Sequence, residues 1–404
     1  MNFIFISPAF PKNYWQWCEA LKQNGVNVLG IGDTPYDELC PELKSALTQY
    51  YRVSNMEDYE QMYRAVAYFA HHYGRIDWIE SNNEYWLEQD ARLRTDFNVT
   101  TGMKTDRITE VKEKSGMKKF YAKGGIRTAR QVRAADGLKK AQQFAKEAGF
   151  PLFVKPDVGV GASDSYKINN EEELTKFFDR EDYALFVIEE FVTGDICTYD
   201  AVINSKGEPI VESMCVCPPS IADIVNQNLD SIYHVESVID ENLRFWGRQT
   251  VKAFDVRSRM VHLEFFRLDR AHTGLGNKGD FVALEANLRP GGGFTPDMIN
   301  YAHNIDIYKI WAEMVVYDER HLPDPHDDYF CVFAGRRANV EYVHQHDEVM
   351  ARYTDAIKMF ERMPAVLAPA MGDLVYIARF RTREEMQEFL DFVCLRRPTP
   401  NPSL

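Results

Sequence analysis

The sequence predicts a mixed α/β and α+β protein with two to three domains. Over the first hundred residues, short apolar runs alternate with stretches whose apolar residues recur at helical spacing, which is typical of a parallel sheet covered by helices. Farther along the chain, paired apolar runs flank turn residues, as in antiparallel hairpins. The length of 404 residues, at roughly 150 residues per domain, leaves room for substantial cores.

Composition restricts the class of partner. With 47 Lys and Arg against 61 Asp and Glu, the formal charge is −14, so the chain lacks the basic footprint of a general nucleic-acid binder. No apolar stretch approaches the roughly 20 residues of a membrane span, and the start lacks a basic flank and a cleavage site. Seven scattered cysteines, including the close pair Cys215 and Cys217, indicate reduced thiols. We therefore expect a cytoplasmic protein that binds neither nucleic acid nor membrane.

The first hundred residues carry a regular strand and helix rhythm. The predicted elements are, in order, strand 3–7, helix 14–23, strand 26–31, helix 57–73, strand 76–80 and helix 83–94. Gly30 and Gly32 follow a strand but lack the third glycine of a dinucleotide-binding fingerprint, so we do not expect a dinucleotide there.

A polar, lysine-rich helix is predicted over 105–123, ending at a candidate domain junction at Gly124 and Gly125. From about Asp318 the tail mixes strands and helices, and its last helix starts with Thr382 and Glu385 at capping-box spacing. The elements predicted in between are strand 150–155, a glycine-rich loop to 163, strand 165–168, helix 171–178, strand 185–190, a hairpin of strands 196–203 and 209–217, helix 241–254, and strands 260–268 and 281–287.

Lys155 ends an apolar strand and is followed by small residues from Gly159 to Ser163. Backbone N–H groups of small residues can approach a polyphosphate closely, and an ammonium group can neutralise it. The order differs from that of a P-loop, in which the lysine follows the glycines. A glycine-rich hairpin turn without a ligand explains the same residues.

Glu189 and Glu190 end a second apolar strand, and Asp195 follows a few residues later. The backbone of such a strand end could read the edge of a purine, and an acidic side chain beyond it could accept hydrogen bonds from ribose hydroxyls. A solvated acidic turn is the alternative.

The strongest pattern lies in the last two predicted strands before the tail. Alternation puts His262 and Glu264 on one face of the first strand, and Glu285 and Asn287 on one face of the second. If the strands pair, opposite residues lie about 5 Å apart, so two carboxylates and an amide oxygen converge. Hard oxygen ligands suit Mg²⁺, and facing carboxylates in a half-buried sheet favour a bound cation. Exposure of one or both carboxylates to solvent is the alternative.

In order and spacing, these three patterns resemble the ATP-grasp superfamily, which includes D-alanine-D-alanine ligase, biotin carboxylase and the L-amino-acid ligases. The most specific element is Glu285-x-Asn287-x-Arg289, followed by proline and glycines. The resemblance covers most of the chain and implies an ATP-grasp fold preceded by a Rossmann-like α/β domain. The implied units are a pre-ATP-grasp domain at 1–105, an ATP-grasp domain at 106–317 with a mobile lid at about 122–192, and a C-terminal α+β segment at 318–404 packed on the core.

Carried over residue by residue, the resemblance implies a nucleotide site. Lys118 matches the first phosphate lysine, but Lys119 and Lys123 are near enough to keep that choice open. Asp195 takes a ribose position where a longer glutamate is common. The implied nucleotide-binding residues are Lys118, Lys155, Gly159, Gly161, Ala162, Ser163, Glu189, Glu190, Phe191, Val192 and Asp195.

The resemblance also implies a metal site and two catalytic side chains. Glu264, Glu285 and Asn287 match the magnesium ligands. Arg289 matches a residue that steadies the transferring phosphoryl group or the substrate carboxylate, and Lys155 acts with it on the phosphates.

The implied enzyme uses ATP and two Mg²⁺ ions, with Mn²⁺ as a substitute, to couple a small-molecule carboxylate to an amine. The carboxylate becomes an acylphosphate, and the amine then displaces phosphate to form an amide. Two alternatives stay open: an ATP-grasp carboxylase or carbamoyl-phosphate-type synthase, and a nucleotide-binding module without catalysis. The sequence does not indicate the oligomeric state, and a homodimer is one state that it allows, since homodimers are common.

Two arginine pairs have two interpretations each. Arg267 and Arg270 could hold a substrate carboxylate or form surface ion pairs. Arg336 and Arg337 could close over the site, although we expect a solvated pair.

Overall fold

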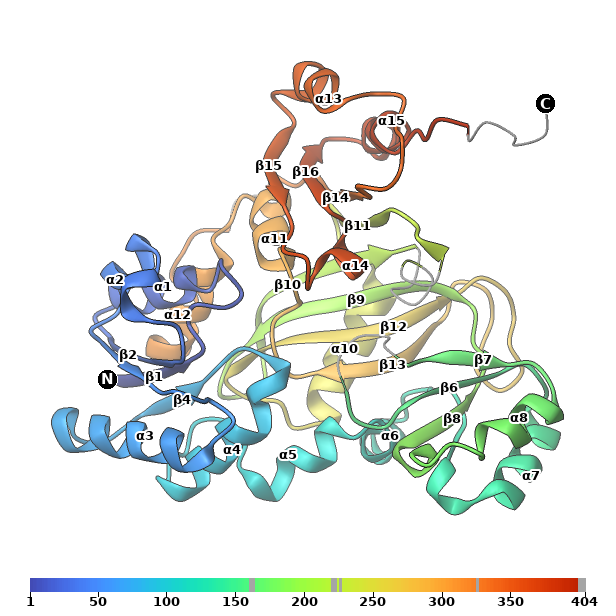
Figure 1. The fold of residues 1–404 in the computed structure, drawn as a ribbon, viewed down its shortest axis with the longest axis horizontal. Helices are drawn as coiled ribbons and strands as arrows, with labels where there is room; N and C mark the ends of the chain where they lie inside the picture. Colours follow the sequence, from blue (N-terminus) through green and yellow to red (C-terminus); the bar gives the residue numbers. More distant parts are fainter. Residues whose placement is uncertain (160–163, 219–223, 225–226, 325–326, 399–404) are drawn as a thin grey trace.

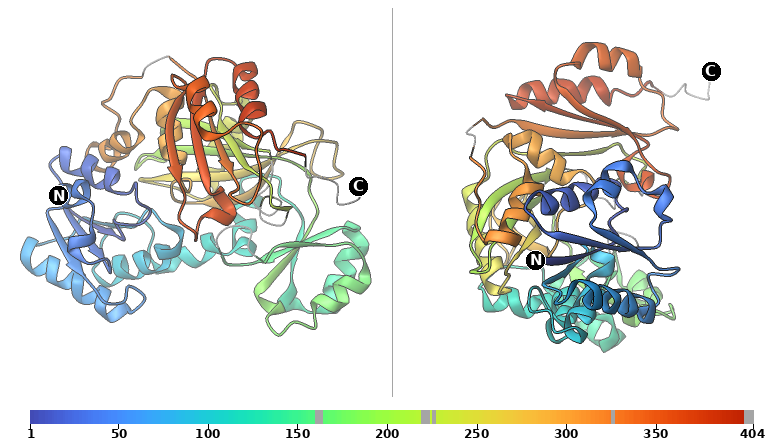
Figure 2. Two further views of the ribbon diagram at one scale, coloured as in Figure 1. Left: turned by 45° about the horizontal axis from the view of Figure 1, so that its top comes forward. Right: turned by 90° about the vertical axis from the view of Figure 1, so that its left-hand side faces the viewer.

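Three sheets organise the part of the chain that the computed structural model describes, which comprises residues 1–159, 164–218, 224, 227–324 and 327–398. A four-stranded parallel sheet forms the N-terminal lobe, an eight-stranded sheet forms the centre, and a second four-stranded sheet forms a separate lobe beside it (Figure 1). Figure 2 shows the last strands of the chain rising from the central sheet as a further lobe.

The N-terminal lobe confirms the predicted parallel α/β rhythm. Its strands run in the order β3-β2-β1-β4 and pair in parallel, and alternate residues of β1 feed the cores on the two faces of the sheet. The elements are β1 (Asn2–Ile6), α1 (Trp15–Gln23), β2 (Asn27–Gly32), η1 (Tyr36–Glu38), α2 (Pro41–Ala46), β3 (Gln49–Arg52), α3 (Tyr59–Tyr73), β4 (Trp78–Glu80), η2 (Glu84–Trp86) and α4 (Leu87–Asp96). The sequence did not predict α2 or β3.

The predicted helix over 105–123 is wrong, because the chain forms two helices, α5 (Thr105–Lys112) and α6 (Lys114–Lys123). Glu113, between them, has an extended backbone with φ −76° and ψ 124°. The first two N–H groups of α6 donate to the carbonyl and carboxylate oxygens of Asp157, at 2.9 and 2.7 Å. The break therefore gives α6 a cap that belongs to a distant loop.

The separate lobe is a four-stranded sheet with two helices. Its strands run in the order β5-β8-β6-β7, and α7 and α8 bury their apolar sides on one face. The sequence predicted the three later strands and α8, but neither β5 nor α7. The elements are β5 (Gln131–Arg133), η3 (Ala134–Asp136), α7 (Leu138–Ala148), β6 (Leu152–Pro156), β7 (Tyr166–Ile168), α8 (Glu171–Phe177), η4 (Tyr183–Leu185) and β8 (Phe186–Glu190).

The central sheet has the strand order β13-β12-β9-β10-β11-β14-β16-β15, with every neighbouring pair antiparallel. One face packs on α6 and α10, and the other packs on α11 and α12, which also contact the N-terminal lobe. The elements are β9 (Gly194–Ile203), β10 (Pro209–Cys217), β11 (Ser231–Val235), α10 (Glu241–Ala253), β12 (Arg259–Leu268), β13 (Phe281–Asn287), α11 (Thr295–His303) and α12 (Ile307–Tyr317). The sequence did not predict β11, α11 or α12.

The tail extends this same sheet, because β11 pairs with β14 and β14 pairs with β16. Its remaining elements are β14 (Phe330–Arg336), α13 (His346–Tyr353), β15 (Ile357–Arg362), α14 (Ala368–Met371), β16 (Leu374–Phe380) and α15 (Arg383–Val393). The predicted capping box of Thr382 and Glu385 is present at the start of α15. None of the helices in the described residues is long and apolar enough to cross a membrane.

Arg336 and Arg337 are not the solvated pair that we expected. Each is 5% exposed. The Arg336 guanidinium donates to the carbonyls of Val393 and His344, at 2.7 and 2.9 Å, and Arg337 donates to that of Leu229, at 2.7 Å. Arg336 therefore ties two backbone segments of the tail together, and Arg337 ties the tail to the segment before β11.

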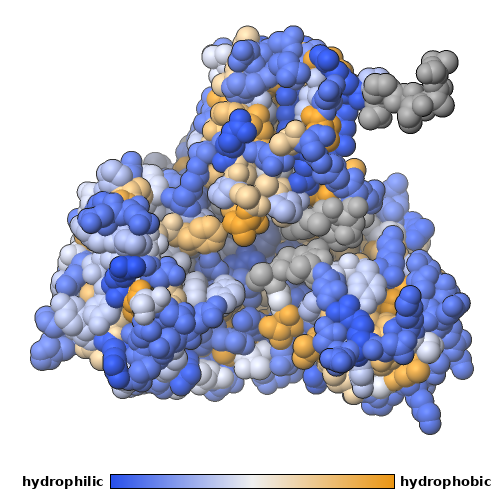
Figure 3. Space-filling view, viewed as in Figure 1, coloured by the Kyte–Doolittle hydropathy of each residue, from blue (hydrophilic) through white to orange (hydrophobic). Residues whose placement is uncertain are grey.

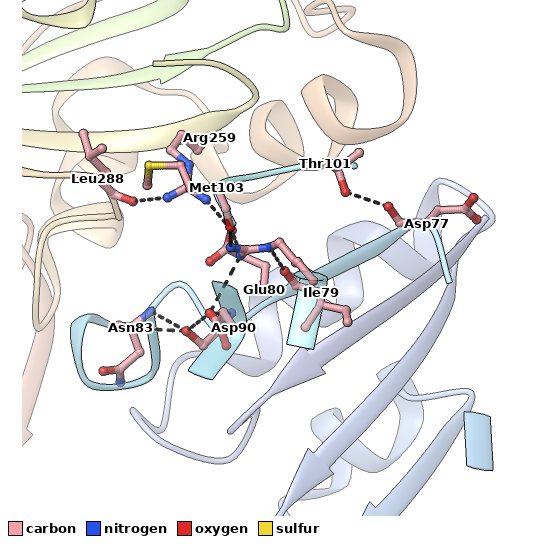
Figure 4. Close-up of polar contacts among 11 residues, drawn as sticks. Asp77, Ile79, Glu80, Asn83, Asp90, Thr101, Met103, Arg259 and Leu288 are labelled. Atoms are coloured by element: carbon pink, nitrogen blue, oxygen red, sulfur yellow. Dashed lines mark hydrogen bonds and ion pairs between the residues drawn. The ribbon is translucent and has the colours of Figure 1, made fainter. Parts of the chain in front are cut away.

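A buried charge network joins the N-terminal lobe to the central sheet (Figure 4). Glu80, at the end of β4, accepts from Arg94 of α4 and from Arg259 of β12, each at 2.9 Å. Arg259 also donates to the Leu288 carbonyl at 2.7 Å, just beyond β13. Burial raises the pKa of Glu80, but the two guanidinium groups outweigh it and hold that pKa below its usual value. This joint fixes the N-terminal lobe against the strands that carry the candidate metal ligands.

Candidate active site

The face of the molecule is hollowed at its centre, between the N-terminal lobe, the separate lobe of β5 to β8 and the tail, with hydrophilic residues on its floor (Figure 3). The candidate residues come from α6, from β6 and β8 of the separate lobe, and from β12 and β13 of the central sheet.

Two lysines converge on the carboxylate of Glu189 in β8. Lys155 Nζ lies 2.7 Å from Oε2, and Lys118 Nζ lies 2.9 Å from Oε1. Burial raises the pKa of Glu189, but the two ammonium groups outweigh it and hold that pKa at about 2. Burial lowers the pKa of Lys118, and Glu189 offsets only part of that effect. One carboxylate for two ammonium groups leaves a net positive charge, which a polyphosphate could neutralise.

A third lysine, Lys114, was missed by the sequence reasoning. It is 7% exposed, and its Nζ lies 3.2 Å from Glu285 Oε1 and donates to the Gly159 carbonyl at 3.3 Å. Lys114 and Lys118 are four residues apart and share one face of α6, so the helical repeat could have found it. The other two candidates lie elsewhere: Lys119 is exposed and pairs with Glu110, and Lys123 is exposed.

The glycine loop begins inside the site. Gly159 has φ 150°, and its carbonyl faces Lys114. Gly161, Ala162 and Ser163 lie outside the described residues.

The predicted hairpin of metal-ligand strands is confirmed in its register. Glu264 of β12 pairs directly with Glu285 of β13, and His262 pairs with Asn287. Asn287 Nδ2 donates to Glu264 Oε1 at 3.2 Å, which leaves its carbonyl oxygen as the group that could coordinate. Burial raises the pKa of Glu285, and the facing Glu264 adds to that rise while Lys114 opposes it.

The donor set fits a magnesium ion. Two facing carboxylates and one amide carbonyl are hard oxygen donors, and a divalent cation between them would relieve their repulsion. Among the described residues, no group of three or more His, Cys, Asp or Glu side chains could hold a metal. Any Mg²⁺ held here would thus need Asn287, together with ligands from the nucleotide or water.

His262 lies beside Glu264 on the same face of β12. Its Nδ1 lies 2.7 Å from Asp200 Oδ1 on β9, and its Nε2 lies 3.6 Å from Glu264 Oε1. Burial lowers the pKa of His262, but Asp200 and Glu264 outweigh it and raise that pKa to about 9. The imidazolium therefore gives Glu264 a cationic neighbour on the side of β9.

The predicted adenine-reading strand end is built around β8. Arg130 donates from Nε and Nη2 to Glu190 Oε2, at 3.0 and 2.7 Å. Val192 is buried, and Phe191 lies under Lys167, whose Nζ is 4.2 Å from the ring centre. The side chain of Glu190 is thus structural, which leaves the backbone of this segment as the part that could read a purine.

The ribose candidate Asp195 is paired in this structure. Its Oδ2 accepts from Arg267 Nη2 at 2.9 Å, and both side chains are partly exposed. Arg270 Nε lies 4.0 Å from Asp269 Oδ1 at the surface. Both arginines therefore form ion pairs, as in the second of their two interpretations.

Arg289 lies just beyond β13, on the side of the N-terminal lobe. Its Nε donates to Glu84 Oε2 at 3.1 Å, and its Nη1 donates to the Pro290 carbonyl at 2.7 Å. The sequence reasoning did not single out Glu84, because nothing in its local pattern reveals a contact across more than two hundred residues.

Comparison with known proteins gives a partial match in sequence. No protein-family profile matches the chain. The D-alanine-D-alanine ligase of Francisella philomiragia is 29% identical over 157 residues, which cover 36% of this chain and 48% of that ligase. The chain thus spans about half the length of that curated relative.

Solved structures match over nearly the whole chain. The L-amino acid ligase from Bacillus licheniformis superimposes with TM-score 0.68 at 15% identity over 99% of both chains. The N5-carboxyaminoimidazole synthetase from Staphylococcus aureus, solved with ADP, gives 0.67 at 11% identity over 96% and 95%. The biotin carboxylase domain of Hydrogenobacter thermophilus 2-oxoglutarate carboxylase, solved with MgADP and bicarbonate, gives 0.66 at 16% identity over 96% and 89%. The chain therefore has the fold of these enzymes, an ATP-grasp fold with a Rossmann-like α/β domain ahead of the ATP-grasp core.

Proposed function

We propose that this protein is an ATP-dependent ligase that activates a carboxylate as an acylphosphate and couples it to an amine. The observation that carries the proposal is the convergence of two lysines on Glu189 beside the facing carboxylates of Glu264 and Glu285. A cationic cluster next to a divalent-metal donor set is the arrangement that phosphoryl transfer from ATP requires. The similarity to ligases of known structure supports the same conclusion.

In this proposal the protein mainly binds and orients ATP and the substrates, and neutralises the charge of the phosphates. Lys118 and Lys155 exchange Glu189 for phosphate oxygens, and Lys114 adds a third positive charge beside Glu285. Glu264, Glu285 and Asn287 hold Mg²⁺, which supplies charge neutralisation on the phosphates when bound. No covalent enzyme nucleophile is required.

The proposed chemistry balances in two steps. A carboxylate oxygen attacks the γ-phosphorus of ATP, the bond to the β-phosphate oxygen breaks, and ADP leaves with that electron pair. The amine nitrogen then attacks the acyl carbon, inorganic phosphate leaves, and the nitrogen loses a proton to give the amide. Arg289 neutralises the carboxylate or the transferring phosphoryl group during the first step.

A second candidate is an ATP-dependent carboxylation that uses bicarbonate. It is favoured by the carboxylase and the carboxyaminoimidazole synthetase among the solved structures, whose TM-scores of 0.66 and 0.67 nearly equal that of the ligase. A nucleotide-binding module without catalysis is disfavoured, because the lysines and the three candidate metal ligands are all present.

The test is a phosphate-release assay with ATP and Mg²⁺ against single carboxylic acids, bicarbonate, and pairs of amino acids. Phosphate release that requires a carboxylate and an amine together supports the ligase. Release with bicarbonate alone supports the carboxylation, and no release with any substrate contradicts both enzyme proposals.

A further inference from the structure

The N-terminus of α6 is held by a loop of the separate lobe. Asp157 lies directly after β6, and its carbonyl accepts from the N–H of Lys114 at 2.9 Å. Its carboxylate accepts from the N–H of Ser115 at 2.7 Å and from the Ser115 hydroxyl at 2.6 Å. Asp157 is 8% exposed, so these three hydrogen bonds are shielded from water and fix the first turn of α6.

The same loop also holds the side chain of Lys114. Two residues after Asp157, the Gly159 carbonyl accepts from Lys114 Nζ at 3.3 Å, and Glu285 Oε1 lies 3.2 Å from that same nitrogen. The backbone of Lys114 is therefore held by Asp157, and its ammonium group is held by Gly159 and Glu285. The position of this ammonium group is thus coupled to the start of the glycine loop.

The local sequence does not stabilise this start of the helix. Lys114 is the first residue of α6, where a positive charge opposes the helix dipole, and the first turn holds no acidic residue. The preceding residue, Glu113, makes no side-chain cap bond within the described part of the chain. Asp157 supplies both the cap and the negative charge from another lobe. A lysine kept at the unfavourable end of a helix in this way indicates a use other than helix stability.

We propose that Asp157 is a positioning residue that sets the ammonium group of Lys114 against the phosphates of ATP. Asp157 itself touches neither the nucleotide nor a metal ion, and it acts only through α6 and Lys114. This inference rests on the proposed function, because it needs an ATP site, but it holds whichever substrate accepts the phosphoryl group.

The reason is that Asp157 joins two lobes that both supply lysines to the site. The N–H of Asp157 donates to the Leu185 carbonyl at 2.8 Å, which anchors it in its own lobe, and Lys155 lies two residues before it. Lys114 belongs to a helix that packs on the central sheet. Without the cap the first turn of α6 frays, and only those molecules that keep Lys114 in place bind the phosphates fully.

The test measures the binding of a non-hydrolysable ATP analogue with Mg²⁺, and of adenosine, by isothermal titration calorimetry. Asp157→Ala should raise the dissociation constant of the analogue roughly three- to thirtyfold and leave that of adenosine unchanged, because adenosine has no phosphate for Lys114. Lys114→Ala should have at least as large an effect, and the double variant should bind no more weakly than Lys114→Ala alone. The matched control is Asp182→Ala, an exposed aspartate of the same lobe, which should bind as wild type.

Two milder variants test the same contacts. Asp157→Asn keeps an acceptor for the Ser115 N–H but loses the charge, so it should recover part of the affinity. Ser115→Ala loses only the hydroxyl contact and should show a smaller loss than Asp157→Ala. These two variants decide the question if circular dichroism shows that Asp157→Ala does not fold.

Three results would overturn the inference: equal weakening of the analogue and of adenosine, an additive loss in the double variant, or unchanged binding in the Asp157 and Ser115 variants. If the analogue binds in a manner that needs Asp157 but no substrate supports phosphate release, the ligase proposal fails and this inference stands. A wild-type protein that does not bind the analogue overturns both.

Discussion

Two buried glutamates have the same charge surroundings and different uses. Glu80 lies between two arginines, each at 2.9 Å, and joins the N-terminal lobe to the central sheet. Glu189 lies between two lysines, at 2.7 and 2.9 Å, in the candidate nucleotide site. The number of neighbouring charges is the same for both glutamates, so it does not distinguish the structural contact of Glu80 from the candidate nucleotide site of Glu189.

The difference lies in what else the cations bind. Arg94 donates to two backbone carbonyls and Arg259 to one, so the planar forks of both are fixed in place. Lys118 and Lys155 carry compact charges on flexible stems, and Lys118 is bonded to one carbonyl besides Glu189. A lysine can change its partner at little cost, whereas an arginine fork engaged on several sides acts as a fixed joint.

Breaking the joint should have the largest effect. Glu80→Ala leaves two guanidinium groups buried without their carboxylate, which should lower the free energy of unfolding by about 3–5 kcal/mol. Urea unfolding followed by circular dichroism measures this. Glu60→Ala removes an exposed partner of Arg64 and should cost less than about 1 kcal/mol. Equal costs for the two variants would show that the joint contributes no more than a surface pair.

Removing a lysine from the site should affect turnover next most strongly. Lys155→Ala should lower ATP-dependent phosphate release roughly a hundred- to a thousandfold, because one preorganised charge on the phosphates is lost. Lys118 still pairs with Glu189, so circular dichroism should show a folded protein. The matched control is Lys119→Ala, an exposed lysine next to Lys118 on α6, which should keep near-normal turnover. Near-normal turnover of Lys155→Ala would contradict the assignment of Lys155 to the ATP site.

Loss of a candidate metal ligand should have a smaller effect that excess metal can correct. Asn287→Ala should raise the Mg²⁺ concentration for half-maximal activity at least roughly tenfold. Mn²⁺ binding, followed by the electron paramagnetic resonance signal of the free ion, should weaken in parallel. Asn242→Ala, an exposed position on α10, serves as the control. An unchanged metal requirement would place the ion elsewhere.

The smallest expected effect is a difference between the wild-type protein and Glu189→Gln in how the free energy of unfolding falls with decreasing pH. The lysines hold the folded-state pKa of Glu189 at about 2, below its ordinary value of 4.5. Between those values the unfolded chain binds one more proton than the folded chain, so this group's stabilisation is present above pH 4.5 and is lost on acidification. Its share of the slope is about 1.4 kcal/mol per pH unit. Glu189→Gln should therefore flatten the fall of unfolding free energy between pH 5 and 3, and parallel profiles for the two proteins would refute the pairing.

The sequence predicted the local and periodic features well. The parallel rhythm of the N-terminal lobe and the facing register of Glu264 and Glu285 follow from apolar alternation, and the structure confirms both. Both depend on residues close in the chain or on strands joined by one hairpin, where the period of the side chains fixes the geometry.

The missed features depend on contacts between distant parts of the chain. The break at Glu113 follows from a cap supplied by Asp157, and the partner of Arg289 comes from Glu84. Lys114 is the exception, because it shares one face of α6 with Lys118 and the helical repeat could have found it; the structure brings both lysines into the site. Sequence patterns carry little information on such pairings, because tertiary packing decides them.

The continuity of the central sheet has a consequence for biosynthesis. β12 and β13, which carry the candidate metal ligands, belong to the same sheet as β16, which ends at Phe380. A ribosome releases the metal-ligand hairpin almost a hundred residues before it releases the strand that completes this sheet. The edge of β11 stays exposed to other chains until β14 emerges, and the edge of β14 then stays exposed until β16 emerges. Folding helpers that shield open sheet edges should therefore act on this protein late in its translation.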